Sequence, residues 1–568
     1  MAGEELDSMD QVLRNRLLAQ ATLRETTGGK QEIVEAARVA LKEKSMREQA
    51  QVLGDGEACG AQQRPEVVAV EKERKTPLVD VLKQQMKLGP IPVAEYMSTV
   101  LSHPKHGYYM RQRVFGEKGD FTTAPEISQI FGEMVGVWIM WAWQAAGSPA
   151  QVQLIELGPG RGTMMADILR TLSSVAHSRP LIHALSVHMV ETSPSLQQVQ
   201  RQTLSKDSLP QANPVKHDGT GVTIHWHDGL SEIPETEGVP SIIVGQEFLD
   251  CLPVRQFRFT DKGWCEKMVD IALPDNPLHF RYVLSPGPTA ASKVCLMPQL
   301  VPNIPKDPEI NTGAEVSPDA CSYATEVGLR VMRTKGAALF IDYGHASQPI
   351  ETMQAALKHA YHDPLSFPGE CDVTAHVDFA AVALAILDGA SPMRDLIQPP
   401  AGLASPEGPA GSAGSAGIAA PSGIAGTGAA GPAGHVAAPP GSGFSPEGLE
   451  GLRGPGAGGE LPPGEASAMV LGGVGTGVTK ASGPKGGLTI HGPISQTAFL
   501  HSLGVRDRVM ALLSELPDEE SADPQAAALT KQYERLCSPE AMGELFKVIA
   551  ITPADSKFGC AGFPAPVR

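Results

Sequence analysis

The hydrophobic positions of this chain alternate between short apolar runs and helical stripes. Five apolar, β-rich runs are predicted to form strands, and they lie at 152–157, 185–191, 222–229, 241–245 and 337–344. Between them, apolar residues spaced with a period of about 3.6 predict helices, among them 163–170 and 193–204. Strands that alternate with helices in this way predict an α/β fold with a doubly wound, mostly parallel sheet.

Composition divides the first part of the chain into regions of different character. Residues 1–75 are polar and predict a helical or disordered extension, because their apolar stripe is too narrow to demand burial. The stripe that begins at residue 76 marks the start of a folded core at 76–388. Within this core, residues 255–335 break into short alternating segments and loops, which predict an insertion on the substrate side of the ligand crevice.

The last part of the chain contains a low-complexity segment followed by folded sequence. Residues 389–487 are mainly Gly, Ala, Pro and Ser, a composition that cannot bury a core and predicts a disordered insertion. Residues 488–568 come next. Amphipathic stripes there predict a C-terminal helical segment that packs back on the sheet, with helices at 497–503, 505–516 and 523–536.

A glycine-rich turn connects the first predicted strand to the next helix. Its spacing is Gly-x-Gly-x-Gly, and such glycines permit positive φ angles and let a ligand approach the backbone. The same pattern also fits an ordinary strand-to-helix connection. The acid two residues before the first glycine would repel a pyrophosphate and favours a cationic ligand such as S-adenosylmethionine. The candidate cofactor-binding residues of this turn are Glu156, Gly158, Pro159, Gly160 and Gly162.

Two more acids follow predicted strands and are candidates for the same ligand. Glu191 ends the second strand, where a carboxylate of a doubly wound sheet hydrogen-bonds ribose hydroxyls; an exposed acid at a strand end is the alternative. Asp228 ends the third strand and is a candidate acceptor for an adenine amino group. A plain Asp-Gly turn explains Asp228 equally well.

Charge and cysteine content narrow the functional classes. The formal charge of −17 opposes binding to nucleic acid backbones, and eight cysteines without a C-x-x-C pair argue against a zinc ribbon or a disulfide framework. The spacing of His and Asp within 359–378 matches no standard ligand pattern, so no metal is expected. No apolar run reaches the roughly 18 residues of a membrane span. Four acids among the first ten residues are untypical of an organelle presequence.

Six segments of the chain carry motifs that occur together in one known family. They are Gly119-Asp-Phe-Thr-Thr-Ala-Pro-Glu-Ile-Ser-Gln, Glu156-Leu-Gly-Pro-Gly-Arg-Gly-Thr, Glu247-Phe-Leu-Asp-Cys-Leu-Pro-Val, Ile341-Asp-Tyr-Gly, Asp372-Val-Thr-Ala-His-Val-Asp-Phe and Met542-Gly-Glu-Leu-Phe-Lys-Val. Together they resemble the MidA-like family of methyltransferases. The likeness covers residues 76–388 and 488–552. Two features depart from it: Gln246 stands where the family usually has Asn, and the Gly/Ala/Pro-rich segment is foreign to the family.

The resemblance implies a Rossmann-like class I S-adenosylmethionine-dependent methyltransferase. Mitochondrial members of the family are complex I assembly factors that dimethylate an arginine of a complex I subunit. The resemblance thus implies a protein arginine methyltransferase with such a protein substrate, symmetric dimethylation and a mitochondrial location, with a cytoplasmic location as the alternative. A methyltransferase with another acceptor, or a non-catalytic assembly chaperone that binds S-adenosylmethionine, are the alternative functions.

Three acids are the candidates for holding the methyl acceptor. A guanidinium stays protonated and has no free lone pair, so paired carboxylates are needed to bind it and to localise its charge away from the attacking nitrogen. Glu247 and Asp250 follow the fourth strand, and Glu126 lies in the first turn of a facing helix. Helix capping and surface solvation are the alternative roles. For Glu126 the alternatives include the helix dipole and the amino group of the cofactor.

Overall fold

The computed structural model describes residues 73–110, 122–206, 209, 211–297, 304–346, 351–389, 479–480, 487–516, 523–556 and 559–564. Most of the predicted extension at 1–75 and nearly all of the predicted disordered insertion at 389–487 lie outside the described residues.

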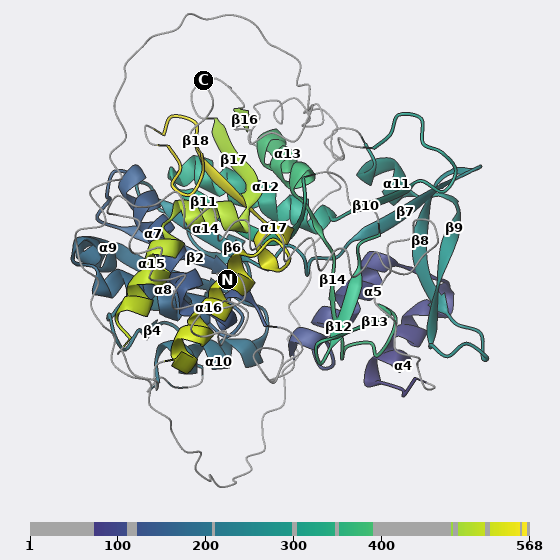
Figure 1. The fold of residues 1–568 in the computed structure, drawn as a ribbon. Helices are drawn as coiled ribbons and strands as arrows, with labels where there is room; N and C mark the ends of the chain where they lie inside the picture. Colours follow the sequence, from purple (N-terminus) through teal and green to yellow (C-terminus); the bar gives the residue numbers. More distant parts are fainter. Residues whose placement is uncertain are drawn as a thin grey trace, which may run out of the picture. The chain divides into compact units, whose positions relative to one another are not determined.

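A mostly parallel sheet forms the centre of the described chain, in the strand order β16-β17-β18-β11-β6-β2-β3-β5-β4. All five predicted strands are present in it and run parallel, and the predicted α/β fold class is confirmed (Figure 1). They are β2 (Val152–Leu157), β3 (Leu185–Val190), β5 (Thr223–His227), β6 (Ser241–Gln246) and β11 (Ala337–His345).

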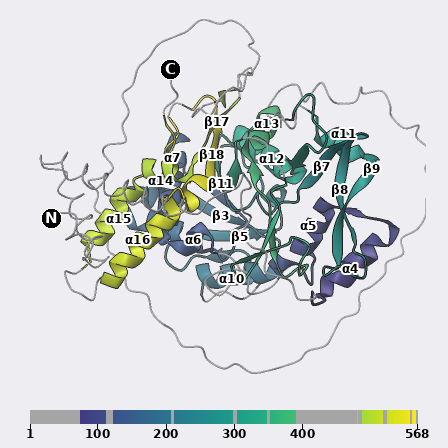
Figure 2. The same ribbon diagram turned by 45° about the vertical axis from the view of Figure 1, so that its right-hand side comes forward.

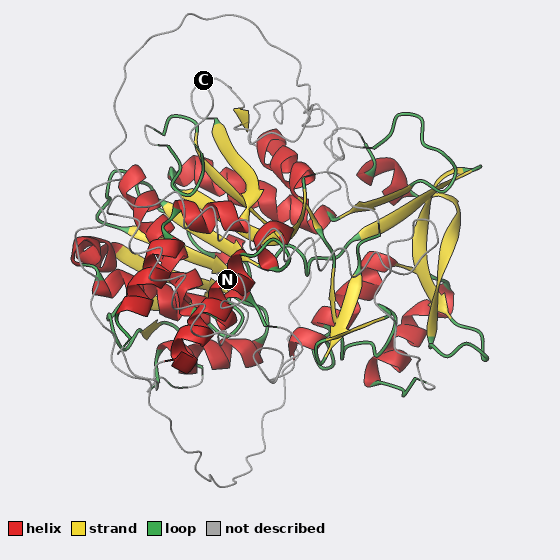
Figure 3. Cartoon of the chain, in the orientation of Figure 1, coloured by secondary structure: helices red, strands yellow, loops and turns green. Residues whose placement is uncertain are grey.

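Helices cover the sheet because successive residues of its central strands are buried on both faces. Ile155 and Ile243 belong to a core that also contains α12 (Pro318–Thr334) and α13 (Phe379–Gly389). Their neighbours in sequence, among them Leu154, are equally buried and point to the opposite face. Helices α7 (Gln129–Ala145) and α8 (Thr163–Ser174) pack against each other, and α7 also contacts β6. Figure 3 shows the strands between the helices.

The end of the chain extends the sheet, which the sequence did not predict. The three predicted helices are present as α14 (Gln496–Ser502), α15 (Val505–Ser514) and α16 (Asp523–Cys537). Two strands flank them, β17 (Leu488–Ser495) and β18 (Phe546–Pro553), so the expectation of a purely helical segment was wrong (Figure 2).

Strand β18 runs antiparallel to β11, and β17 runs antiparallel to β18. The Gly492-Pro493 pair, which by itself predicts a turn, falls within a register shift of β17 between His491 and Ile494. The free edge of β11 therefore decided the structure of this segment, and that edge lies far away in the sequence.

A second substructure consists of three separate stretches of sequence. Its five-stranded sheet contains β1 (Ile91–Pro92), β7 (Arg255–Thr260), β8 (Gly263–Ile271), β9 (Phe280–Pro288) and β10 (Gly313–Val316). Helices α4 (Pro77–Gln85) and α5 (Val93–Ser102) share its hydrophobic core with the small sheet of β12 (Gln354–Leu357), β13 (Ala360–His362) and β14 (Asp372–Thr374). The predicted insertion at 255–335 therefore extends too far at its carboxyl end, because α12 packs on the main sheet and not in the second substructure.

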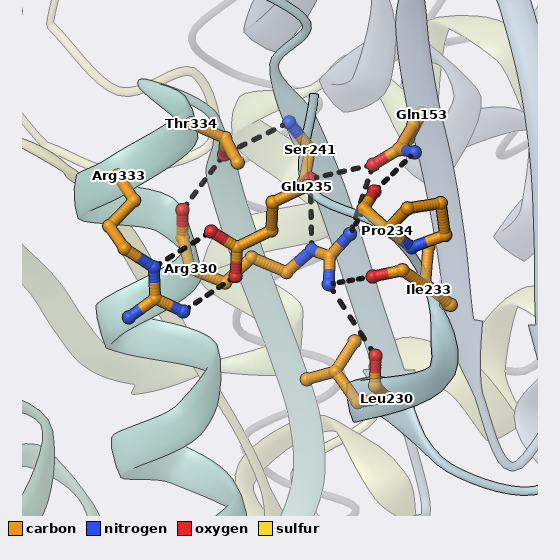
Figure 4. A network of polar contacts seen from close by, with 9 residues as sticks. All are labelled: Gln153, Leu230, Ile233, Pro234, Glu235, Ser241, Arg330, Arg333 and Thr334. Atoms are coloured by element: carbon orange, nitrogen blue, oxygen red, sulfur yellow. Dashed lines mark hydrogen bonds and ion pairs between the residues drawn. The ribbon is translucent and has the colours of Figure 1, made fainter. Parts of the chain in front are cut away.

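A buried guanidinium fixes α12 to the amino-terminal ends of the central strands (Figure 4). Arg330 is 3 % exposed and donates to Ser241 Oγ at 3.0 Å, to Gln153 Oε1 at 3.0 Å and to the carbonyl oxygen of Ile233 at 2.9 Å. All of these acceptors are neutral, and burial lowers the pKa of Arg330. Hydrogen bonds therefore compensate the desolvation of this charge.

We expect Arg330→Met to lower the free energy of unfolding by about 2–4 kcal/mol, because several buried acceptors lose their donor. The matched control is Arg333→Met, which removes a half-exposed arginine of the same helix that pairs with Glu235, and which we expect to cost less than about 1 kcal/mol. Urea unfolding of both variants measures the difference. Equal losses would contradict a structural role for Arg330.

Candidate functional site

A cavity of about 390 Å³ opens at the carboxyl ends of the central strands. The strand order reverses between β2 and β6, and such a reversal is where open α/β sheets bind ligands. The volume lies within the roughly 300–1,000 Å³ that is usual for ligand sites.

The second wall of this cavity comes from α5, from Tyr109 and Met110, and from β12–β14. None of the described residues between 255 and 316 lines it, although Asp319 and Tyr323 of α12 do. The described β-strands of the predicted insertion at 255–335 therefore do not line this cavity, and its place on the substrate side stays a prediction. The tertiary structure brings other segments to this position.

The glycine turn has the backbone that the sequence predicted. Gly158, Gly160 and Gly162 have φ angles of +62°, +52° and +80°, a region that favours glycine. A β-carbon on Gly158 would lie 2.9 Å from the ring of Phe248, whereas one on Gly160 would meet no atom within 4 Å. Packing therefore requires the first glycine, while the second lies beside open space. Pro159 lines the same cavity.

Glu156 brings a buried carboxylate to the cavity. It is 2 % exposed, and among the described residues its Oε2 atom has no hydrogen-bond partner and its carboxylate no ion pair. Burial raises its pKa to about 8. An unpaired carboxylate is costly to bury, so this residue fits a ligand that carries a positive charge, such as the sulfonium and ammonium groups of S-adenosylmethionine.

Glu191 is held in place by two hydrogen bonds. Its carboxylate accepts from the N–H of Ser193 at 2.8 Å and from Nε2 of Gln200 at 3.1 Å. Burial nevertheless raises its pKa to about 7. Gln200 Nε2 also lies 2.8 Å from the carbonyl oxygen of Gly160, so one amide links the glycine turn to the acid of the neighbouring strand.

Gln200 is not among the predicted site residues, although the sequence carries a signal for it. Leu196, Gln200 and Leu204 lie four residues apart and are all buried, so a polar residue interrupts the apolar stripe of α10 (Pro194–Leu204). Its Oε1 atom accepts from Nε1 of Trp226 at 2.8 Å, which completes the hydrogen bonding of this buried amide.

Asp228 and Glu126 line the cavity in different ways. Asp228 is exposed at the end of β5, 3.4 Å from Nε2 of Gln197. Glu126, in α6 (Ala124–Ile127), accepts from the hydroxyl of Thr163 at 2.6 Å and lies 3.9 Å from Arg161. The carboxylate of Glu126 is therefore engaged with the glycine turn.

Glu247 and Asp250 leave β6 in a tight turn. Glu247 has a φ angle of +48°, which is unusual for a residue other than glycine. Its Oε1 atom accepts from the N–H of Ala124 at 3.1 Å and from the side-chain amide of Gln246. Gln246, which stands where the family usually has Asn, therefore supplies an amide donor at this position. Asp250 is 6 % exposed, and its Oδ1 atom has no hydrogen-bond partner within the described part of the chain.

Asp342 holds this turn from the neighbouring strand. Its Oδ2 atom accepts from the N–H groups of Phe248, Leu249 and Asp250 at 3.1, 2.8 and 3.3 Å. The side chain is fully buried in β11. The sequence contained a signal here also, since Asp342 is an acid inside an otherwise apolar run, but its three partners could not be deduced from that run.

Burial and neighbouring charges raise the pKa values of the acids at this turn. Burial raises the pKa of Glu247 to about 7, and burial together with the charge of Glu247 raises that of Asp250 to about 7. Burial and both neighbouring acids raise the pKa of Asp342 well above its ordinary value. Among the described residues, the cavity is lined by one arginine, Arg161, and by eight acids: Glu126, Glu156, Glu191, Asp228, Glu247, Asp250, Asp319 and Asp372.

Comparison with known proteins identifies the family. Residues 134–393 match a family of S-adenosyl-L-methionine-dependent methyltransferases. The chain is 40 % identical over 318 residues to "Protein arginine methyltransferase NDUFAF7, mitochondrial" of Rattus norvegicus. The matched region covers 55 % of this chain and 70 % of the relative. The chain is also 40 % identical to the Homo sapiens protein of that name, over 54 % of this chain and 68 % of the relative. The chain belongs to this methyltransferase family.

Solved structures agree with the fold of this methyltransferase. A crystal structure of a Burkholderia thailandensis protein bound to S-adenosyl-homocysteine has a TM-score of 0.54 and 23 % identity, and it covers 86 % of this chain and 93 % of that one. A native structure of a related protein from the same organism has the same score and covers 95 % of its own chain. The predicted S-adenosylmethionine-dependent methyltransferase and its MidA-like family are thereby confirmed.

The buried acids of the methyltransferase predict a pH-dependent stability. The pKa of Glu156 is about 8 in the folded chain against an ordinary value of 4.5, so the folded state retains a proton that the unfolded chain releases. This stabilisation is fully present below about pH 4.5 and is lost as the pH rises through about 8. We expect Glu156 alone to account for roughly 2–4 kcal/mol of that loss.

Urea unfolding of the ligand-free protein between pH 5 and 8 measures this effect, and Glu156→Gln should flatten the dependence. The exposed acid Glu309 is the control, because Glu309→Gln should leave the slope unchanged. Identical slopes for the wild type and Glu156→Gln would count against a protonated Glu156.

We expect Asp342→Asn to lower the free energy of unfolding by about 2 kcal/mol, because the amide places an N–H₂ group against backbone donors. Displacement of the Glu247–Asp250 turn should also slow methyl transfer by a factor on the order of 100.

Asp270→Asn, in β8 and paired with Arg281, is the matched control and should change neither quantity appreciably. Urea unfolding and incorporation of radioactive methyl groups into mitochondrial proteins measure the two effects; a normal transfer rate in Asp342→Asn would be the contrary result.

Proposed function

We propose that this chain is a protein arginine methyltransferase that acts on an arginine in a complex I subunit. The observation that carries the proposal is the turn of Glu247 and Asp250, two carboxylates with raised pKa values, in a cavity whose described lining contains eight acids and one arginine. A cavity of this charge favours a cationic acceptor. The names of the relatives, which are arginine methyltransferases, support the same acceptor.

The cofactor half of the cavity has features suited to S-adenosylmethionine, which when bound supplies an electrophilic methyl group. The turn at Gly158–Gly162, with Pro159, leaves space for the ligand beside Gly160, and Glu156 attracts its positive charge. Glu191 is the proposed acceptor for the ribose hydroxyls, and Asp228 for the adenine amino group. Glu126 orients the glycine turn through Thr163, so we assign it a positioning role in place of the catalytic role first expected.

The acceptor half has features suited to a guanidinium. Glu247 and Asp250 would bind its N–H groups and hold the positive charge on the nitrogens that do not attack. As the new nitrogen–carbon bond forms, the attacking nitrogen loses a proton. The carboxylate of Asp250 is the proposed base for this proton, and its pKa of about 7 suits proton acceptance near neutral pH.

The partner and the product are proposed from the resemblance. Complex I is supported by the function of mitochondrial family members, and the same resemblance favours symmetric dimethylation. A mitochondrial location is supported by the relatives, whose names state it. A methyltransferase with another acceptor, and a non-catalytic assembly chaperone, are the competing functions. No helix among the residues that the structure describes is long and apolar enough to span a membrane.

We expect Glu247→Gln and Asp250→Asn each to lower kcat by a factor of about 10² to 10³, because each removes a charge that acts on the acceptor. Affinity for S-adenosyl-homocysteine, measured by titration calorimetry, should change by less than about threefold. The rate of the wild type should rise between pH 6 and 8 as the acids with pKa near 7 ionise.

The assay measures the transfer of radioactive methyl groups to purified complex I subunits, with mass spectrometry to locate the label. Gly160→Val is the control for cofactor binding, since its φ of +52° strains valine. Label on arginine supports the proposal. Label on another residue favours a different acceptor, and cofactor binding without label favours the chaperone.

A further inference from the structure

Two exposed apolar side chains lie at the cavity of this methyltransferase. Among the described residues, ten large hydrophobic side chains are exposed, and two of these line the cavity: Tyr361 at 53 % and Leu545 at 45 %. We call this pair the apolar rim. A ligand that fills the cavity contacts its lining, so both side chains lie where a bound substrate would meet them.

The two residues of the apolar rim come from different substructures. Tyr361 lies on β13, opposite Ala356 in the small sheet of the second substructure. Leu545 ends α17 (Met542–Leu545), which packs against α14 and α16 beside the main sheet. Separate segments therefore bring apolar surface to one cavity, so a ligand that spans the cavity can contact both.

The inner surface behind the apolar rim is polar and acidic. Tyr343, whose ring centroid lies 5.6 Å from that of Phe546, lines the cavity together with Gln354 and Asp250. An arginine side chain fits such a lining, because its aliphatic stem tolerates aromatic neighbours and its guanidinium pairs with carboxylates. The backbone that carries this arginine then has to pass the mouth of the cavity, where the apolar rim lies.

We propose that the apolar rim binds large apolar residues adjacent to the target arginine, so that the preferred substrate is an extended segment with an arginine flanked by residues such as leucine. This inference rests on the proposed function, since it assumes that the arginine enters the acidic cavity. The acids that line the cavity match the charge of the arginine, and the apolar rim matches the polarity of the residues beside it. The burial of two half-exposed side chains accounts for a preference of about tenfold.

The test uses the full chain saturated with S-adenosyl-homocysteine and two synthetic peptides that differ only in the two residues beside a single arginine. These are leucine in one peptide and serine in the other, and calorimetry measures both Kd values. We expect the wild type to bind the leucine peptide about tenfold more tightly, and Tyr361→Ser and Leu545→Ser each to reduce that ratio by about threefold. Leu284→Ser, a change at a similarly exposed residue that does not line the cavity, should retain the ratio.

The contrary outcomes are distinct. Equal Kd values, absence of binding by both peptides, or a preference that survives in both rim variants would overturn the inference. Because this measurement requires no catalysis, it is independent of the reaction. A preference that depends on the apolar rim, combined with no label on the arginine when S-adenosylmethionine replaces the product, supports the apolar rim and overturns only the proposed arginine methylation.

Discussion

The carboxylate of Asp342 connects the central sheet to the acidic turn, and the rest of the site depends on that connection. Three consecutive backbone N–H groups, from Phe248 to Asp250, donate to one of its oxygen atoms. This fixes a turn whose first residue, Glu247, has a positive φ angle that a free chain would seldom adopt. Two side chains are set by the same turn: Phe248, which packs against the glycine turn, and Asp250, which lines the cavity.

Buried acids without cations are the second constraint on this methyltransferase. Glu156, Glu191, Glu247 and Asp250 all have pKa values raised by burial, in a cavity where one arginine lines the part that the structure describes. Such a group of acids lowers the stability of the ligand-free protein near neutral pH and increases its affinity for cations. The cofactor and the proposed acceptor both carry positive charge. The same acids that lower the stability of the ligand-free protein therefore strengthen the binding of these two ligands.

The cavity combines a half built from consecutive strands and turns with a half assembled from distant segments. The cofactor half follows directly from consecutive strands and turns, and Gln200 links two of them through Gly160 and Glu191. The acceptor half needs α5, β12–β14 and α17, which lie hundreds of residues apart. Relatives that share the first half can therefore differ in acceptor, because the second half depends on tertiary contacts.

The sequence by itself determined the five parallel strands, the glycine turn and the acids Glu156, Glu191 and Glu247. These follow from local patterns, since strand burial sets the apolar runs and backbone geometry sets the glycines. It did not determine β17 and β18, because their pairing depends on the edge of β11 and a bulge conceals the pattern of β17. Nor did it determine the cavity wall. Only the folded structure decides which segments meet there, because these contacts join residues far apart in the chain, and no local periodicity records them.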